Sequence, residues 1–241
     1  MPCFVAQTID AARMATSDPE VQEEILRRAL RQMADWGSQM PPPILAARIH
    51  NTVRDLSGCA DPYLAAKQRS NRLACEVLAE IRPAVEASRD PFAAAAKLAI
   101  AANVIDLGVK MGRQYSESSV RGDMRSALGE DLPKRELEAL RMATSEARSV
   151  LYLADNAGEV VFDRLLVERL PRGAVAVAVR GGPILNDALL ADAEAAGLAE
   201  VAEIIDNGTA VPGTALEECP EDFRRRFEQA DVVISKGQGN Y

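Results

Sequence analysis

Three short segments in the last third of the sequence place acids, amides and glycines directly after apolar runs. They are 155–159 (Asp-Asn-Ala-Gly-Glu), 180–187 (Arg-Gly-Gly-Pro-Ile-Leu-Asn-Asp) and 236–240 (Lys-Gly-Gln-Gly-Asn). In an open parallel α/β sheet, the loops that leave the carboxyl ends of the strands line one crevice, so segments far apart in the sequence can meet there. The sequence therefore predicts a ligand site built from these three loops.

The first two loops contain candidate ligands for a divalent cation. Asp155, Asn156 and Asp187 offer two carboxylates and one amide carbonyl, which suit Mg²⁺ and leave positions for water and a substrate phosphate. As an alternative, Asp155 with Asn156, and Asn186 with Asp187, cap the helices that follow them. The two roles can coexist. Because both pairs follow apolar strands in the same half of the chain, we favour a ligand site.

The third loop has the composition of an anion site. Gly237 and Gly239 allow backbone N–H groups to approach a phosphate, Lys236 adds a positive charge, and Asn240 adds a polar side chain. The loop matches neither the G-x-x-x-x-G-K-[ST] pattern nor the G-x-G-x-x-G dinucleotide fingerprint. Its glycines can equally form a tight turn, so the loop is a phosphate candidate only together with the other two.

Two further groups are candidate substrate contacts. Arg180 and Gly181 begin the second loop, where a guanidinium can fork a phosphate and a glycine exposes its backbone; Asn186 lies later in the same loop. In the N-terminal half, Asn103 and Asp106 interrupt an apolar, alanine-rich run and share one helical face. They either form a structural hydrogen bond between helices or reach the crevice.

Composition and charge exclude several classes of protein. The chain has 241 residues with a net charge of -8, which argues against a nucleic-acid or anionic-membrane surface. No apolar run spans a membrane and no secretory leader is apparent, so we expect a soluble, cytoplasmic protein. The four cysteines form no C-x-x-C pair, and His50 is the only histidine. Zinc sites and Ser-His-Asp catalysis are therefore disfavoured, and any metal is expected to be a hard cation such as Mg²⁺ or Mn²⁺.

Residues 1–148 have the pattern of an all-α domain. Asp18-Pro19, Asp61-Pro62 and Asp90-Pro91 each place a capping acid before a proline suited to the first helical position. Apolar spacing and alanine content predict helices over 21–36, 44–56, 63–81 and 92–109.

The rest of this half is less regular. Pro83 is expected to kink or end the third helix. The segment 115–132 shows no clear period and is interpreted as a connection, and 134–148 is predicted to be helical.

From residue 149 onward, strands and helices alternate. Strands are predicted over 149–154, 174–179, 201–205 and 231–235, with helices over 159–170, 188–196 and 220–229. This alternation predicts an α/β fold: a Rossmann-like three-layer α/β/α core with a mostly parallel sheet over 149–241, preceded by the all-α domain over 1–148.

The three loops, in this order and spacing, resemble the DUF89 family of metal-dependent damage-control phosphatases, and look closest to its stand-alone prokaryotic branch. Asp90-Pro91-Phe92, Asn103-Val104-Ile105-Asp106 and the segment 67–71 look like the helical half of the family, so the resemblance covers most of the chain.

The resemblance implies a divalent metal, Mg²⁺ or Mn²⁺ with Co²⁺ or Ni²⁺ as further candidates, bound by Asp155, Asn156 and Asp187. Lys236 would then stabilise the phosphoryl group. It further implies hydrolysis of phosphate monoesters of small metabolites, such as sugar phosphates or damaged phospho-metabolites.

The sequence departs from the family pattern at three places. Ala102 stands where the family usually has glycine, and Cys3 is present without the second cysteine of a paired motif. Family members also continue past the lysine-glycine loop, which suggests that the chain is truncated at its C-terminus. A non-catalytic module that binds a phosphorylated ligand, and a Rossmann-like transferase, are the competing functions; the missing glycine fingerprint disfavours the transferase.

Overall fold

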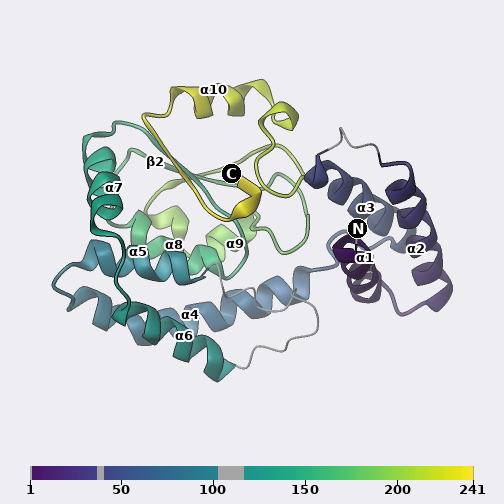
Figure 1. Cartoon of the computed structure of the whole chain (residues 1–241), viewed down its shortest axis with the longest axis horizontal. Coiled ribbons are helices and arrows are strands. Elements are labelled where there is room, and N and C mark those ends of the chain that lie inside the picture. Colours follow the sequence, from purple (N-terminus) through teal and green to yellow (C-terminus); the bar gives the residue numbers. More distant parts are fainter. Residues whose placement is uncertain (1, 37–40, 103–116, 241) are drawn as a thin grey trace.

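The computed structural model describes residues 2–36, 41–102 and 117–240. Its N-terminal part is helical, and strands and helices alternate from residue 150 onward (Figure 1). The helices of the first part are α1 (Pro2–Ala15), α2 (Pro19–Ala34), α3 (Pro42–Ser57), α4 (Leu64–Glu86), α5 (Pro91–Ala102), α6 (Glu117–Gly129) and α7 (Lys134–Glu146). The second part contains β1 (Val150–Leu153), α8 (Glu159–Val167), β2 (Val175–Val179), α9 (Leu190–Ala195), β3 (Glu203–Asp206), α10 (Glu221–Gln229) and β4 (Val232–Ser235), with short 3-10 turns at Leu198–Glu200, Leu216–Glu218 and Gln238–Asn240.

Asp18 and Asp90 cap helices as the sequence predicts, whereas Asp61 does not, because α4 begins at Leu64 with Tyr63 as its N-cap. The Asp18 carboxylate accepts hydrogen bonds from the N–H groups of Glu20, at 2.9 Å, and Val21, so it satisfies donors that have no partner within the first turn of α2. Asp90 accepts from the Ala93 N–H at 3.0 Å at the start of α5.

One expectation about the helices is wrong, and of the two alternatives at Pro83, a kink or an end, the second is excluded. The segment 115–132, interpreted as a connection, contains α6, whose buried residues Val120, Met124 and Ala127 lie on one face at spacings of four and three. The serines and Gly122 between them obscured this period. Pro83 does not end its helix, because α4 continues to Glu86.

The sheet is parallel, with strand order β3-β2-β1-β4. Leu153, the last residue of β1, pairs with Ala178 of β2 and with Ser235 of β4. The three strands therefore end at one edge, and the loops that follow them begin side by side. The predicted α/β class with a mostly parallel sheet is confirmed.

Alternate residues of the strands face two different layers of helices. Val150 and Tyr152 belong to a core shared with α4, α5, α6 and α8, whereas Leu151 and Leu153 pack with Cys219 and Phe223 beside α10. Figure 1 shows α5 and α8 on one side of the sheet and α10 on the other. This is the three-layer arrangement that the sequence predicts.

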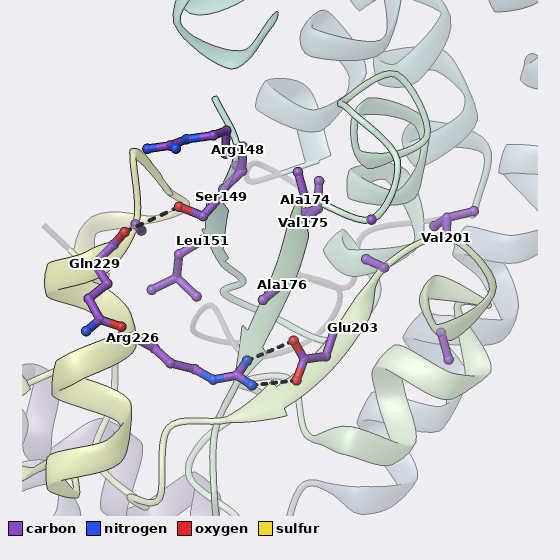
Figure 2. A pocket seen from close by; sticks show the side chains of 15 residues that line it. Arg148, Ser149, Leu151, Ala174, Val175, Ala176, Val201, Glu203, Arg226 and Gln229 are labelled. Atoms are coloured by element: carbon purple, nitrogen blue, oxygen red, sulfur yellow. Dashed lines mark hydrogen bonds and ion pairs between the residues drawn. The ribbon is translucent and has the colours of Figure 1, made fainter. Parts of the chain in front are cut away.

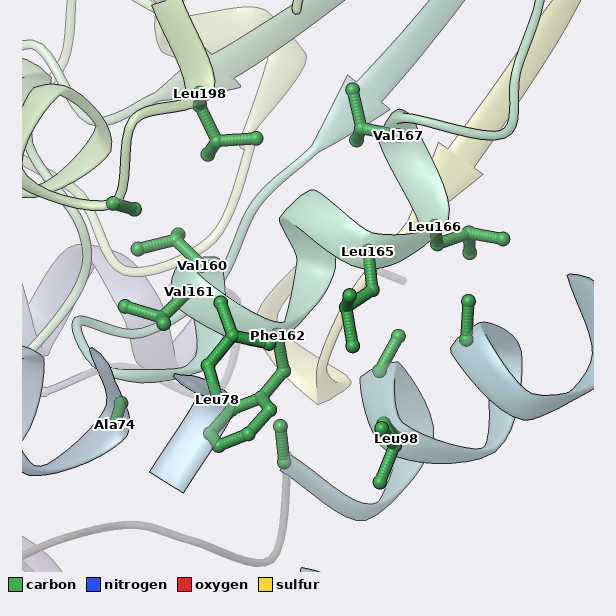
Figure 3. Packing of buried hydrophobic residues seen from close by; sticks show 14 of the residues in the cluster. Ala74, Leu78, Leu98, Val160, Val161, Phe162, Leu165, Leu166, Val167 and Leu198 are labelled. Carbon is green, nitrogen blue, oxygen red and sulfur yellow. The ribbon is translucent and has the colours of Figure 1, made fainter. Parts of the chain in front are cut away.

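The largest hydrophobic core lies between α8 and the helices α4 and α5. Phe162 and Leu165 of α8 point toward Leu78 of α4 and Leu98 of α5 (Figure 3). Burying one such side chain contributes about 1.5 to 3 kcal/mol to stability. This core extends across residue 148, so α4, α5 and α6 form part of the support of the sheet; the domain division at that residue stays a prediction.

Helices α1, α2 and α3 form a separate bundle with its own small cores. His50 of α3 is buried there beside Tyr63, and burial, with the charge of Arg54, lowers its pKa to about 4. The bundle meets the second polar loop through Leu185 and through Arg54, whose Nη1 donates to the Pro183 carbonyl at 2.6 Å. No helix in the described ranges is long and apolar enough to cross a membrane.

Candidate metal and phosphate site

The first two polar loops are bonded to each other through their backbones. Asn156 and Asp187 form an isolated antiparallel bridge, the Ala157 N–H donates to the Asn186 carbonyl at 2.9 Å, and the Ala188 N–H donates to the Asp155 carbonyl at 2.8 Å. These contacts bring together the three predicted metal ligands, which are 32 positions apart at most in the sequence.

Helix capping does not explain these residues. The N-cap of α8 is Gly158 and that of α9 is Leu189, and neither residue caps its helix through its own side chain. The alternative that Asp155 with Asn156, and Asn186 with Asp187, occupy the N-cap positions is therefore wrong.

Arg180 lies at the centre of the site with its guanidinium fully engaged. Its Nε is 2.7 Å from Asp187 Oδ2, its Nη2 is 3.8 Å from Asp155 Oδ1, and its Nη2 donates to Asn240 Oδ1 at 3.2 Å. The residue is 1% exposed. Arg180 therefore connects all three loops, and it orients Asp187 rather than standing open as a fork for phosphate.

Lys236 is held by two acids of α8. Its Nζ lies 2.8 Å from Asp163 Oδ1 and 3.5 Å from Glu159 Oε2, and Asp163 Oδ1 also accepts from the Tyr152 hydroxyl at 2.8 Å. Burial opposes the charge of Lys236, but the two carboxylates outweigh burial and raise the pKa of the ammonium. A fixed positive charge is thus present beside the first loop.

The carboxylates of Asp155 and Asp187 are disfavoured as anions in the absence of a bound cation. Burial, followed by the charges of Asp187 and Glu159, raises the pKa of Asp155 to about 7, although Arg180 opposes the shift. Burial also raises the pKa of Asp187 despite its bond to Arg180. Perturbed titration in a buried polar cluster is typical of functional sites.

The charge balance of this cluster fits a divalent cation. Among the described residues, its ion pairs join the carboxylates of Asp155, Asp187, Glu159 and Asp163 to two cations, Arg180 and Lys236. When all six side chains are ionised, two negative charges are unbalanced, and one Mg²⁺ or Mn²⁺ would neutralise them.

The donor set itself is small. Across the described parts of the chain, no group of three or more His, Cys, Asp or Glu side chains is arranged to hold a metal ion. The candidate set of Asp155, Asn156 and Asp187 has two carboxylates and an amide, and such a set leaves coordination positions for water and a phosphate. Asn156 is tied to the acids through its Nδ2, which donates to Asp155 Oδ2 at 3.1 Å and Glu159 Oε1 at 2.6 Å.

Gly237 allows the third loop to lie directly against Asp155. A Cβ atom at Gly237 would be 1.7 Å from Asp155 Oδ2, and the residue has a φ of +75°. Glycine is required here for both reasons. At the other glycine of this loop the tighter requirement falls on its neighbour: a Cβ at Gly213 would lie 1.7 Å from the Gly239 carbonyl oxygen, whereas a Cβ at Gly239 would lie 3.2 Å from the Gly213 Cα.

The remaining predicted contacts serve to build the loops. Asn240 donates through Nδ2 to the carbonyls of Ala154, at 3.0 Å, and Lys236, at 2.7 Å. The N–H of Gly181 donates to the Thr209 carbonyl at 2.9 Å, so this amide is already occupied. Asn103 and Asp106 lie outside the described residues.

Sequence reasoning did not assign roles to several residues that the structure places in the site. Glu159 and Asp163 are both fully buried acids, four apart on α8, and this spacing on an apolar helix was the available signal. Tyr152 adds a hydroxyl from within β1. Asn207 and Thr214 order the neighbouring loops: Asn207 Oδ1 accepts from the Gly181 N–H at 3.2 Å, and the Thr214 hydroxyl donates to Asn240 Oδ1 at 2.7 Å.

A cavity of about 500 Å³ lies at the other end of the sheet, where β1 and β2 begin (Figure 2). It is lined by exposed Arg148, apolar Leu151 and Ala176, and the ion pair between Arg226 and Glu203. None of the predicted site residues lines it.

Comparison with known proteins identifies the family of this chain. The model of the damage-control phosphatase ARMT1-like domain matches residues 1–241. A damage-control phosphatase of Archaeoglobus fulgidus is 33% identical over 99% of this chain and 83% of its own length, and one of Pyrococcus horikoshii is 31% identical over 100% of this chain and 83% of its own length.

A solved structure gives the same result for the fold. The crystal structure of a DUF89 family protein from Pyrococcus horikoshii superposes with a TM-score of 0.87 at 30% identity, covering 99% of this chain and 83% of that one. Both the resemblance inferred from the three loops and the general expectation of a phosphatase are thereby confirmed at the level of the family. The chain belongs to the damage-control phosphatase, or DUF89, family.

Proposed function

We propose that this protein is a metal-dependent phosphatase that hydrolyses phosphate monoesters of small metabolites, such as sugar phosphates or damaged phospho-metabolites. The observation that carries the proposal is the unbalanced negative charge around Asp155 and Asp187, at the edge of the sheet where three loops converge. Because the chain belongs to the damage-control phosphatase family, we expect such a site to hydrolyse phosphate esters.

Asp155, Asn156 and Asp187 are the proposed ligands of the metal, with Mg²⁺ or Mn²⁺ favoured and Co²⁺ or Ni²⁺ as further candidates. The cation, when bound, would polarise a phosphoryl oxygen and lower the pKa of a water molecule. Arg180 holds Asp187 in place through its Nε, at 2.7 Å.

Lys236 is the proposed partner of the phosphoryl group. Its ammonium is already positioned by Asp163 and Glu159, so it needs no reorganisation when negative charge develops on the substrate. Both a water molecule and an aspartate remain candidates for the attacking group.

The test is turnover by metal-stripped protein. Hydrolysis of p-nitrophenyl phosphate and of a panel of sugar phosphates is measured with and without Mg²⁺, Mn²⁺, Co²⁺ or Ni²⁺. We expect phosphate release that requires metal, and Asp155→Ala is expected to abolish it while unfolding stays cooperative. Asp222→Ala is the control, because this acid is 88% exposed on α10.

Three outcomes would count against the proposal. Unchanged turnover in Asp155→Ala would show that Asp155 takes no part in the reaction. A folded wild-type protein that binds phosphate esters without hydrolysing them would instead be a binding module. Binding of a nucleotide in the absence of metal would favour the transferase alternative.

A further inference from the structure

Asn71, a buried amide on α4, is hydrogen-bonded at both ends of its side chain. Its Oδ1 accepts from the Gly158 N–H at 2.7 Å, and its Nδ2 donates to Asp192 Oδ1 at 2.7 Å. Asn71 and Asp192 are each 6% exposed. A primary amide donates and accepts from opposite atoms, so asparagine can join a backbone N–H to a carboxylate, which neither aspartate nor leucine can do.

Asp192 extends this connection to the second loop. Its Oδ2 accepts from the Leu189 N–H at 2.9 Å, two residues after Asp187. Lys67 of α4 lies between two acids, with its Nζ 3.6 Å from Asp192 Oδ2 and 2.7 Å from Asp61 Oδ2.

Gly158 brings the first loop into close contact with α4. It has a φ of +83°, and a Cβ at this position would be 3.2 Å from the Cβ of Ser70. The next residue toward the site is Ala157, whose N–H is bonded to the Asn186 carbonyl of the second loop. A displacement of Gly158 is therefore transmitted to both loops.

We propose that Asn71 and Asp192 are positioning residues that fix the separation between Asp155 and Asp187. With Lys67 they form what we call the α4 clamp. The clamp acts through the backbone of Gly158 and Leu189, one on each loop. This inference rests on the proposed function, since what the clamp positions is the proposed metal site.

A purely structural role predicts a different outcome, and the chain offers a matched control. Arg82 also ties α4 to α8, through hydrogen bonds from its guanidinium to both carboxylate oxygens of Glu168 at 2.7 and 3.0 Å. This pair joins the same two helices at their far ends, beyond the loops. Loss of Arg82 therefore weakens the packing of α4 without releasing either loop.

The test compares Asn71→Leu and Asp192→Asn with Arg82→Met. Asn71→Leu keeps the branching and the number of side-chain heavy atoms but removes both hydrogen bonds of the amide. For each variant, the Kd for Mn²⁺ is measured by calorimetry on metal-stripped protein, and kcat and KM are measured for p-nitrophenyl phosphate at saturating Mn²⁺. Hydrogen exchange of the Gly158 and Leu189 amides measures whether the hydrogen bonds of the clamp are intact, and it needs neither metal nor substrate.

The clamp variants are expected to bind Mn²⁺ about 10- to 100-fold more weakly, as is typical when residues that orient metal ligands are lost. Their kcat should fall and the amide of Gly158 should exchange faster. Arg82→Met should lower Tm while leaving the Mn²⁺ affinity and kcat of the wild type. Should Asn71→Leu not fold, Asn71→Ser serves instead, since a hydroxyl reaches only one of the two partners and an intermediate loss is expected.

The proposal is overturned if Asn71→Leu or Asn71→Ser keeps the Mn²⁺ affinity and kcat of the wild type. The variant would then match Arg82→Met, and Asn71 would have only a structural role. Failure of the proposed function has a different signature, because the wild-type protein itself would then neither bind Mn²⁺ nor turn over substrate. In that case unchanged exchange at Gly158 and Leu189 would also refute the clamp as a tie between the loops.

Discussion

The two ends of the sheet use the same ionic side chains in opposite ways. At the amino end, Arg226 and Glu203 form an ion pair at 2.7 Å, and their side chains are 47% and 56% exposed (Figure 2). At the carboxyl end, Arg180 and Asp187 form a pair of the same length, with side chains that are 0% and 6% exposed. Arg226 donates two hydrogen bonds to Glu203, at 2.7 and 2.8 Å, and Arg180 donates one to Asp187, so the exposed pair has the fuller geometry and the buried pair differs chiefly in its burial.

Burial decides what each pair contributes. An exposed pair loses little hydration and contributes about 0.2 to 1 kcal/mol. A buried pair loses the hydration of both ions, and an apolar replacement of similar shape is often as stable or more so. The carboxyl end therefore carries an arrangement of charge that stability alone does not favour, as expected for a functional site.

The largest effect is expected from removing one carboxylate charge at the buried end. Asp187→Asn keeps the shape of the side chain but removes a proposed metal ligand, and we expect kcat for p-nitrophenyl phosphate to fall at least about 100-fold, beyond the loss typical of a residue that only supports a ligand. Asp231→Asn is the matched control at the amino end, where Asp231 accepts from the N–H groups of Arg148 and Ser149 at 2.8 and 3.0 Å. Equal loss in both variants would contradict the comparison.

Lys236 provides the second contrast. Lys236→Met leaves Asp163 and Glu159 buried without their cation, so we expect a loss of about 3 to 5 kcal/mol in the free energy of unfolding, measured with guanidinium chloride. KM for phosphate esters should rise while the Kd for Mn²⁺ changes less. Adding Asp163→Asn removes one unpaired charge and should restore part of the stability. An equal loss of metal affinity and substrate binding in Lys236→Met would show that the loop has been misinterpreted.

A comparison of two glycines distinguishes the effect of close packing from that of backbone strain. Gly237 and Gly173 have φ values of +75° and +78°, but a Cβ would strike Asp155 Oδ2 at the first and meets no atom within 4 Å at the second. Both alanine variants carry a backbone cost of about 1 kcal/mol or more. Only Gly237→Ala should also lose activity, because Asp155 must move. Equal turnover in the two variants would mean that the position of Asp155 is not critical.

The sequence was most informative where one loop follows one strand. Acids and glycines after the apolar runs predicted that the loops of Asp155, Asp187 and Lys236 meet, and they do, because parallel strands end at a common edge. What could not be predicted is the direction of each side chain. Arg180 was predicted to bind a phosphate through its guanidinium. In the structure the guanidinium instead points inward and donates to Asp187 and to Asn240 of the third loop.

Long-range partners were the other limit of the sequence. Asn71 meets Gly158 and Asp192, residues 87 and 121 positions away, and no local pattern encodes these pairs. The α6 helix was missed for a local reason, because serines and Gly122 weaken its apolar period, and it forms because Val120 and Met124 are buried against the shared core.

A smaller effect is expected from pH. The pKa of Asp155 is about 7 in the folded, metal-free protein and about 3.8 as the reference for the unfolded chain. Between these values the folded state binds more protons, so the contribution of Asp155 to stability falls as pH rises from 4 to 7. Asp155→Asn should reduce this dependence in chemical unfolding at pH 5 and pH 8. Added Mn²⁺ should stabilise the wild type more at pH 8, because a metal ligand must be deprotonated. An unchanged pH dependence in the variant would contradict the assignment.

The smallest effect is expected at the exposed end. Arg226→Ala breaks the ion pair with Glu203, and because both side chains are about half exposed, the free energy of unfolding should fall by only about 0.2 to 1 kcal/mol, with less effect at high salt. Turnover and Mn²⁺ affinity should equal those of the wild type. Urea unfolding at 0.05 M and 1 M NaCl checks the first point and activity measurements check the second, with Glu203→Gln as the reciprocal variant. A loss of turnover in either variant would show that the two ends of the sheet are energetically coupled, and burial would then no longer distinguish the functional end.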